Sequence, residues 1–350
     1  MSMEHENVKR IAVLGSGAMG HGIAQVAAGA GYTVTVRDIA REFIDGARQK
    51  IEGNLKRNVE RGRMKEEEAR ALMGRISFTV DLAEAVRDAD LVIEAIPEDL
   101  ELKRKVWGEV SGNAGGDTVF ATNTSSLSIT QIATGVPHPE RFLGMHFFNP
   151  PTHMRLVEVI PGKKTGAQAI ELVKAVAARL GKTPVVVKKD VAGFIVNRVL
   201  ITYLNEAAKL VETGKWTKEQ VDSAMQYRAK MPMGPFMLSD LIGLDIVYNI
   251  LKVFEKDLGP KYRPAKNIEA LFKEKKLGQK TGEGFYGYKV RPAVTEEAGR
   301  GFDTNLLLRP LLEEAEKVVS EGIADRESVD AAMKLGANLP MGPFEMKGVR

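Results

Sequence analysis

The chain has 350 residues, of which 44% are hydrophobic, and a formal net charge of +4 at pH 7. A chain of this length is expected to form two or three domains. It contains no cysteine, which excludes disulfides, a thiolate nucleophile and a cysteine-ligated zinc site. The N-terminus lacks an apolar signal segment, and no apolar run approaches the roughly 20 residues of a spanning helix, so we expect a cytoplasmic protein with no membrane partner.

The small excess of basic residues could attract a polyanionic ligand, but acidic residues are interleaved almost everywhere along the chain. Interleaved charges are typical of a solvated surface and not of a nucleic-acid site. We therefore expect no nucleic-acid partner, and we assign no metal ligands.

The first half of the chain alternates short apolar segments with helical ones. Residues 8–14 (VKRIAVL) predict a buried strand, residues 18–30 a helix and residues 32–37 (YTVTVR) a second strand. Residues 42–73 are heavily charged with a thin apolar stripe, and they predict a hairpin of two helices broken near 61–63. Further strands are predicted at 76–79, 91–94, 119–122, 142–146, 156–160 and 184–187. This pattern predicts an α/β fold, with a Rossmann-type doubly wound sheet over residues 1–187.

The second half changes character and contains an internal repeat. Apolar residues recur at helical spacing from 194 to about 277, which predicts an all-α domain over 188–290. After a polar linker, the motif MGPF of 233–236 returns 108 residues later. Other pairs share this offset: Gly193-Phe194 with Gly301-Phe302, and Val221-Asp222 with Val329-Asp330. We infer that residues 291–350 are a partial second copy of the all-α domain, which suggests that the chain was cut from a longer polypeptide or lost its last helices.

A glycine-rich loop, GSGAMG, lies between the first predicted strand and the first helix. Gly15 permits a tight turn, Gly17 lets the backbone approach a pyrophosphate, and Gly20 lets the helix pack against the strand. Ala18 and Met19, inside the same loop, are assigned to the cofactor site with them. The N–H groups at the start of the following helix would face the phosphates.

Asp38 ends the next predicted strand, 18 residues after Gly20. A carboxylate at this point accepts hydrogen bonds from ribose hydroxyls and repels a 2′-phosphate, so it favours NAD over NADP. The preceding Arg37 could soften that preference.

A neutral histidine is suited to taking a hydroxyl proton near pH 7. Among the five histidines, His146 ends an apolar strand in GMHFFNP, where strand ends of such sheets open onto a ligand crevice. Glu158 interrupts another apolar strand, LVEVI, and a carboxylate there is costly to bury unless it is paired. We therefore predict that Glu158 pairs with His146, fixes the imidazole tautomer and stabilises the imidazolium.

Two further polar groups have less definite roles. Ser125 and Ser126, in ATNTSSLSI, follow the strand at 119–122 and could either hold a substrate oxygen or cap the next helix. Asn197, in KKDVAGFIVNR, is an amide among apolar residues where the two domains meet, which favours a ligand contact over a hydrogen bond in the core.

Together these motifs resemble the L-3-hydroxyacyl-CoA dehydrogenase family. The matching segments run in the family's order over about residues 8–290: GSGAMG, DLVIEAIPEDLELK, ATNTSSLSI, RFLGMHFFNPP, LVEVI, KDVAGFIVNR, MGPF and LGQKTGEGFYGY. The resemblance implies an NAD-dependent oxidation of a 3-hydroxyacyl-CoA thioester to a 3-oxoacyl-CoA, in fatty-acid or short-chain acyl-CoA metabolism. It also implies that the helical hairpin covers coenzyme A.

The resemblance implies roles for individual residues. His146 is the base and Glu158 its electrostatic partner, while Ser125 contacts the 3-oxygen and Asn197 the acyl portion. Asn149 supports the same pocket. The residues implied to contact the cofactor, beyond the glycine loop and Asp38, are Glu98, Lys103, Asn123 and Lys280.

The chain departs from single-function members of the family in its second helical copy. This feature is similar to the dehydrogenase part of multifunctional fatty-acid oxidation proteins, where the second copy replaces a partner's domain. We therefore expect a homodimer or a pseudo-dimer through the helical domains. The alternatives are a dehydrogenase of a free hydroxy or sugar acid, a non-catalytic cofactor-binding protein, and the dehydrogenase fragment of a hydratase/dehydrogenase fusion.

Overall fold

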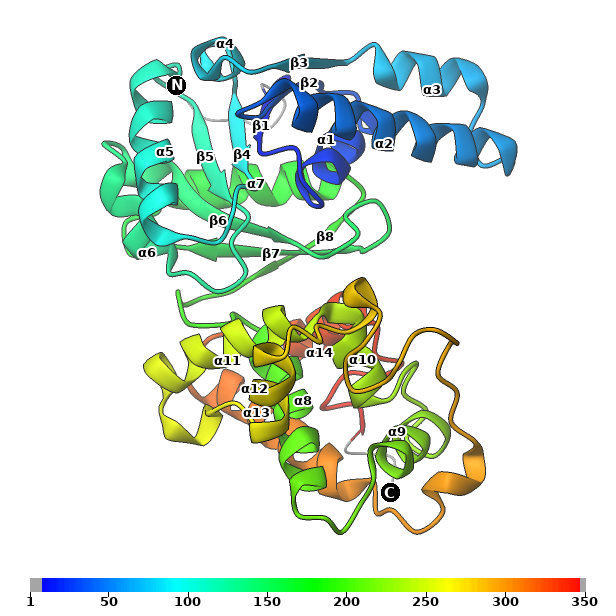
Figure 1. The fold of residues 1–350 in the computed structure, drawn as a ribbon. Helices are drawn as coiled ribbons and strands as arrows, with labels where there is room; N and C mark the ends of the chain where they lie inside the picture. The colour runs from blue at the N-terminus through cyan, green and yellow to red at the C-terminus, as the bar shows by residue number, and fades with distance from the viewer. Residues whose placement is uncertain (1–7, 347–350) are drawn as a thin grey trace. The chain divides into compact units, whose positions relative to one another are not determined.

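The computed structural model describes residues 8–346. It divides into two compact units, one ending at Asp190 and the other beginning at Val191. The first unit is a sheet with helices on its faces, and the second is helical throughout (Figure 1). Each unit is described here by itself.

Eight strands of the described residues form one sheet in the order β3-β2-β1-β4-β5-β6-β7-β8. The first six positions in this order are parallel, β7 runs antiparallel to β6, and β8 is parallel to β7. The strand bounds are β1 (Arg10–Leu14), β2 (Thr33–Arg37), β3 (Ile76–Thr79), β4 (Leu91–Glu94), β5 (Val119–Thr122), β6 (Phe142–Phe147), β7 (Leu156–Pro161) and β8 (Thr183–Val186). The order 3-2-1-4-5-6 is that of a dinucleotide-binding sheet, so the predicted Rossmann-type fold is confirmed.

The strands are apolar because helices cover both faces of the sheet. In β4 every residue is buried, and in β1 all but the first are, as expected of central parallel strands. The covering helices are α1 (Gly20–Gly29), α4 (Leu82–Val86), α5 (Leu100–Asn113), α6 (Ile129–Ile132) and α7 (Ala167–Arg179). Short 3-10 turns, η2 (Ala133–Gly135) and η3 (Pro139–Arg141), complete this unit.

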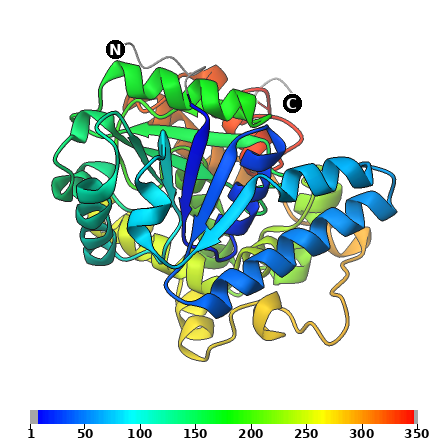
Figure 2. The same cartoon turned by 90° about the horizontal axis from the view of Figure 1, so that it is seen from above.

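A helical hairpin, α2 (Arg41–Glu60) and α3 (Glu66–Met73), projects from the sheet (Figure 2). The buried residues of α2 are Ile44, Ala47, Ile51 and Leu55, at three- and four-residue spacing. This stripe faces the protein while the charged remainder faces solvent. The break predicted near 61–63 is the turn between the two helices.

The helical unit contains two copies of one helix pair. The first copy and its extension are α8 (Val196–Glu212), α9 (Lys218–Tyr227), α10 (Pro235–Ile242), α11 (Leu244–Leu258), η4 (Pro260–Tyr262), α12 (Lys266–Lys273) and η5 (Gln279–Thr281). After η6 (Glu296–Gly299), the second copy is α13 (Asn305–Ser320) and α14 (Arg326–Gly336). Both copies belong to the same compact unit.

The repeated motifs form the same aspartate-to-backbone hydrogen bond in each copy. The carboxylate of Asp222 accepts a hydrogen bond from the backbone N–H of Phe236 at 2.8 Å, and Asp330 accepts one from Phe344 at 2.9 Å. A Cβ on Gly234 would lie 2.4 Å from Asp222. A glycine in MGPF is therefore required because the aspartate packs directly on the backbone.

Among residues 8–346, no helix is both long and apolar enough to cross a membrane. The cores of both units are instead built from short amphipathic or buried elements.

Candidate active site

The glycine loop joins β1 to α1 with little space around two of its glycines. Gly15 has φ +90°, and a Cβ there would lie 2.5 Å from the carbonyl oxygen of Ala95. A Cβ on Gly20 would lie 1.7 Å from the carbonyl oxygen of Gly15. By contrast, a Cβ on Gly17 would meet nothing within 4 Å. The loop therefore keeps open backbone at the one position where a pyrophosphate is expected to approach, so the residues present fit a dinucleotide.

Ala18 and Met19 lie between the glycines and the first residue of α1. The helix begins at Gly20, two residues later than the sequence predicts, which leaves both residues in the loop. Their assignment to the cofactor site stays a prediction.

Asp38 follows the last residue of β2 and is half-buried. Its carboxylate accepts hydrogen bonds from the backbone N–H and the hydroxyl of Ser16, each at 2.7 Å, and from the N–H of Ile39 at 2.7 Å. These donors hold the carboxylate beside the glycine loop. Arg37 donates instead to the carbonyl oxygen of Val80.

His146 and Glu158 lie opposite each other on the antiparallel strands β6 and β7. The imidazole Nδ1 is 2.8 Å from the carboxylate Oε2. The Glu158 side chain is fully buried, and that of His146 is 7% exposed. The predicted pairing across neighbouring strands is therefore present in the structure, and a solvent-facing Glu158 is excluded.

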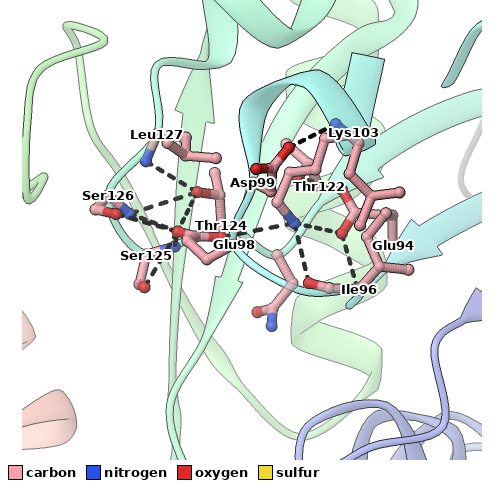
Figure 3. A network of polar contacts seen from close by, with 12 residues as sticks. Glu94, Ile96, Glu98, Asp99, Lys103, Thr122, Thr124, Ser125, Ser126 and Leu127 are labelled. Atoms are coloured by element: carbon pink, nitrogen blue, oxygen red, sulfur yellow. Dashed lines mark hydrogen bonds and ion pairs between the residues drawn. The ribbon is translucent and has the colours of Figure 1, made fainter. Parts of the chain in front are cut away.

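Ser125 and Ser126, after β5, do not cap the next helix. Ser128 is the N-cap residue of α6, and its hydroxyl accepts the N–H of Gln131. Ser125 and Ser126 instead direct their N–H groups and hydroxyls to the Glu98 carboxylate (Figure 3). Of the two roles left open by the sequence, the helix cap therefore belongs to a different serine.

Glu98 is the centre of this hydrogen-bond network. Its Oε1 also accepts the hydroxyl of Thr124 at 2.6 Å, and its Oε2 lies 3.6 Å from the Lys103 ammonium. Burial acts to raise the pKa of Glu98, but Lys103 and the hydrogen bonds outweigh it and lower the pKa. Glu98 is therefore an anion at neutral pH.

Lys103 and Glu94 form a buried ion pair beneath Glu98, with Nζ and Oε1 2.5 Å apart and both side chains fully buried. Glu94, which stands at the end of β4, was not among the site residues predicted from the sequence. The available indication was a carboxylate terminating an otherwise apolar strand, LVIE.

Two asparagines lie near the end of β6. Asn123 follows β5, and its Oδ1 accepts the N–H of Phe147 at 2.8 Å, next to His146. Asn149 is exposed and lies just after β6. Asn123 thus ties the end of β5 to the strand that carries the histidine.

Asn197 and Lys280 belong to the helical unit. Asn197 is half-buried at the second residue of α8. Lys280 lies in η5, with Nζ 2.5 Å from Asp245 Oδ1. Their expected contacts with ligands remain predictions.

The sheet unit therefore contains a glycine loop after β1, the Asp38 carboxylate after β2, and a buried histidine–carboxylate pair on β6 and β7. Residues 10–191 match the 3-hydroxyacyl-CoA dehydrogenase NAD binding domain, and residues 193–288 and 301–348 match the C-terminal domain of the same family. The chain belongs to the 3-hydroxyacyl-CoA dehydrogenase family. NAD as the cofactor and a dehydrogenase as the class of enzyme, both predicted from sequence, are confirmed.

Individual relatives agree with this assignment. The chain is 42% identical over 289 residues to the mitochondrial hydroxyacyl-coenzyme A dehydrogenase of Rattus norvegicus, which covers 81% of this chain and 92% of the relative. It is similar to the crystal structure of 3-hydroxybutyryl-CoA dehydrogenase from Escherichia coli K12, with a TM-score of 0.90, 28% identity and coverage of 97% and 90% of the two chains.

A third relative extends across the second helical copy. The alpha subunit of the fatty acid oxidation complex of Idiomarina loihiensis is 35% identical over 363 residues, covering 97% of this chain and 50% of that protein. Residues 301–348, within the predicted second helical copy, also match the C-terminal domain of the family.

Proposed function

We propose that this 3-hydroxyacyl-CoA dehydrogenase oxidises (S)-3-hydroxyacyl-CoA thioesters reversibly to 3-oxoacyl-CoA, in fatty-acid or short-chain acyl-CoA metabolism. The observation that carries this proposal is the buried pair of His146 and Glu158, with 2.8 Å between Nδ1 and Oε2. A buried imidazole held by a carboxylate is suited to removing the proton of a secondary alcohol.

The pair defines how the proton moves. Because Glu158 engages Nδ1, the imidazole takes the hydroxyl proton on Nε2. The carboxylate stabilises the imidazolium, and in the reverse direction the imidazolium returns the proton to the 3-oxygen. NAD, when bound, supplies the acceptor for the hydride that C3 releases.

We assign the remaining site residues to binding and orientation. Ser125 holds the 3-oxygen, and the hydrogen bond from its N–H to Glu98 at 2.8 Å fixes the backbone that carries the hydroxyl. Asn197 and Asn149 bind the acyl portion near the thioester. The carboxylate of Asp38 lies beside the glycine loop, where it recognises the ribose hydroxyls of NAD.

The remaining assignments concern the cofactor and the thioester. We propose that Asn123 and Lys280 contribute to the cofactor site. The charged α2–α3 hairpin, which projects from the sheet (Figure 2), is proposed to cover the coenzyme A portion.

The second helical copy is proposed to act as a built-in partner for the first. Arg198 on α8 pairs with Glu314 on α13 at 2.5 Å, and both side chains are almost fully buried. The repeat offset of 108 residues makes Glu314 the counterpart of Glu206 on α8. One copy therefore contributes the arginine and the other the glutamate, as two subunits would across a pseudo-two-fold interface.

We propose a cytoplasmic location, on the basis of a cysteine-free sequence that suits a reducing compartment. The acyl-CoA thioester is the proposed small-molecule partner.

The test is a kinetic screen of the purified chain. NADH should be consumed with acetoacetyl-CoA, and much more slowly with free acetoacetate or with NADPH as the reductant. The variant His146→Gln should bind NAD normally and lose about 10²–10⁴-fold in kcat, the usual contribution of a general base. Faster turnover of the free acid than of the thioester would replace this proposal with a hydroxy-acid dehydrogenase.

A further inference from the structure

The carboxylate of Glu94, at the carboxyl end of β4, is fully buried and surrounded by hydrogen-bond donors. Its Oε1 accepts the N–H of Ile96 at 2.9 Å and the ammonium of Lys103 at 2.5 Å. Its Oε2 accepts the hydroxyl of Thr122 at 2.7 Å and the indole N–H of Trp107 at 3.3 Å. Four donors, from the loop after β4, from α5 and from β5, therefore fix one carboxylate in place. Three of these residues, Ile96, Lys103 and Thr122, are labelled beside Glu94 in Figure 3.

Lys103 connects this carboxylate to Glu98. Its side chain is fully buried, and three oxygens surround Nζ: Glu94 Oε1 at 2.5 Å, the carbonyl oxygen of Ile96 at 3.3 Å and Glu98 Oε2 at 3.6 Å. Nζ donates hydrogen bonds to the first two of these oxygens, and the third lies at ion-pair distance. In this arrangement Lys103 bridges two carboxylates and faces no solvent.

Glu98 in turn holds the loop after β5. The N–H of Ser125 is 2.8 Å from Glu98 Oε1 and its hydroxyl is 3.3 Å away. The N–H and hydroxyl of Ser126 lie at 3.1 and 3.2 Å from the same oxygen. The position of the Ser125 side chain therefore depends on the position of the Glu98 carboxylate.

A purely structural role does not account for this arrangement. Burying the charged side chains of Glu94 and Lys103 carries a large desolvation penalty, and apolar residues of similar volume often make a fold equally stable or more so. The group lies at the carboxyl ends of β4 and β5, the edge where open α/β sheets bind their ligands.

We propose that Glu94 is a positioning residue for the reaction: it fixes Lys103, and through Lys103 and Glu98 it sets the place of the Ser125 hydroxyl. This inference rests on the proposed function, in which Ser125 holds the 3-oxygen of the substrate. It also gives Lys103 a supporting role beneath Glu98 in place of the direct cofactor contact expected from sequence.

The experiment compares Glu94→Gln with wild type, alone and combined with Ser125→Ala. Loss of orientation at a reacting group can cost about 10²-fold, so kcat of Glu94→Gln should fall by about that factor while the Kd for NAD changes less than about 3-fold. In the Ser125→Ala background the same substitution should lower kcat by less than about 3-fold, because the two residues act through one contact.

A second variant tests the same role of Glu94 if Glu94→Gln folds poorly. Thr122→Val removes one hydroxyl donor to Glu94 at the carboxyl end of β5 and should lower kcat by about 10-fold, the effect of one hydrogen bond to a charged group. Its matched control is Thr118→Val, which removes a buried hydroxyl that donates to the carbonyl oxygen of Ala89 at 2.7 Å, just before the same strand. That control should leave kcat within about 2-fold of wild type.

Two results would overturn the inference. One is a fall in kcat of about 10²-fold when Glu94→Gln is added to Ser125→Ala, as large as in the wild-type background. The other is an equal fall in kcat for Thr122→Val and Thr118→Val. A wild-type chain without thioester activity would reject the proposed function itself, so the two failures are distinguishable.

Discussion

The sharpest consequence of the structure concerns the charge on Glu158. Substituting Glu158→Gln keeps the size of the side chain and an oxygen near His146 Nδ1, but removes the negative charge that faces a developing imidazolium. The 2.8 Å distance between Nδ1 and Oε2 puts the centres of the two charges about 4 Å apart, where their attraction is about 4 kcal/mol at an effective dielectric constant of about 20. Both groups are buried, so solvent screens this attraction little.

That energy converts directly into a rate. If the imidazolium is fully formed in the transition state, losing this attraction lowers kcat by about 10³-fold. If the imidazolium is half formed, kcat falls by about 30-fold. The assay is oxidation of NADH by acetoacetyl-CoA, with the Kd for NAD measured by titration calorimetry. His153→Gln is the control, because His153 is exposed and hydrogen-bonded to Thr152, and it should keep wild-type kcat. A Glu158→Gln variant with intact folding and kcat within about 3-fold of wild type would refute the electrostatic reasoning.

Three further predictions follow from other parts of the fold. Gly17→Ala should leave the melting temperature unchanged, since its Cβ meets nothing within 4 Å, but should weaken the binding of NAD at least about 10-fold. Gly15→Ala should instead destabilise the protein by about 1–3 kcal/mol, because φ at this position is +90°. Equal melting temperatures for the two variants would contradict this. Arg198→Met leaves the buried Glu314 without its main partner and should cost about 3 kcal/mol in the free energy of unfolding, measured with urea; a loss below about 1 kcal/mol would show that the pair is dispensable. Burial raises the pKa of Asp222 to about 7, so the folded state holds a proton that the unfolded chain releases near pH 4. The folded state therefore loses stability as the pH rises from about 4 toward 7. Asp222→Asn should flatten the dependence of melting temperature on pH over that interval, and an unaltered slope would exclude the effect.

Local patterns were enough to predict most of the secondary structure. The strands and the helical hairpin lie within one or two residues of the predicted ranges, because apolar runs, glycines and charged stripes report directly on burial and chain turns. The 108-residue repeat likewise predicted a duplicated helix pair, and the structure adds that Asp222 and Asp330 cap equivalent N–H groups.

Local sequence patterns predicted only part of the candidate site. Glu158 was found because it interrupts an apolar strand, whereas Glu94 was missed because it stands at the end of one. The four donors to Glu94 come from the loop after β4, from α5 and from β5, spread over residues 96–122. Such a cluster has no short-range pattern.

The sequence alone determined the periodicity of the elements, the glycine loop and the supply of ionisable side chains, since each depends on neighbours in the chain. Only the tertiary structure decided that His146 faces Glu158, because the register of β6 against β7 depends on packing over the whole sheet. It also decided that Ser125 is held by Glu98 while Ser128 caps α6. Hydrogen bonds between residues distant in sequence form only where the assembled strands and helices bring donors within reach of buried acceptors.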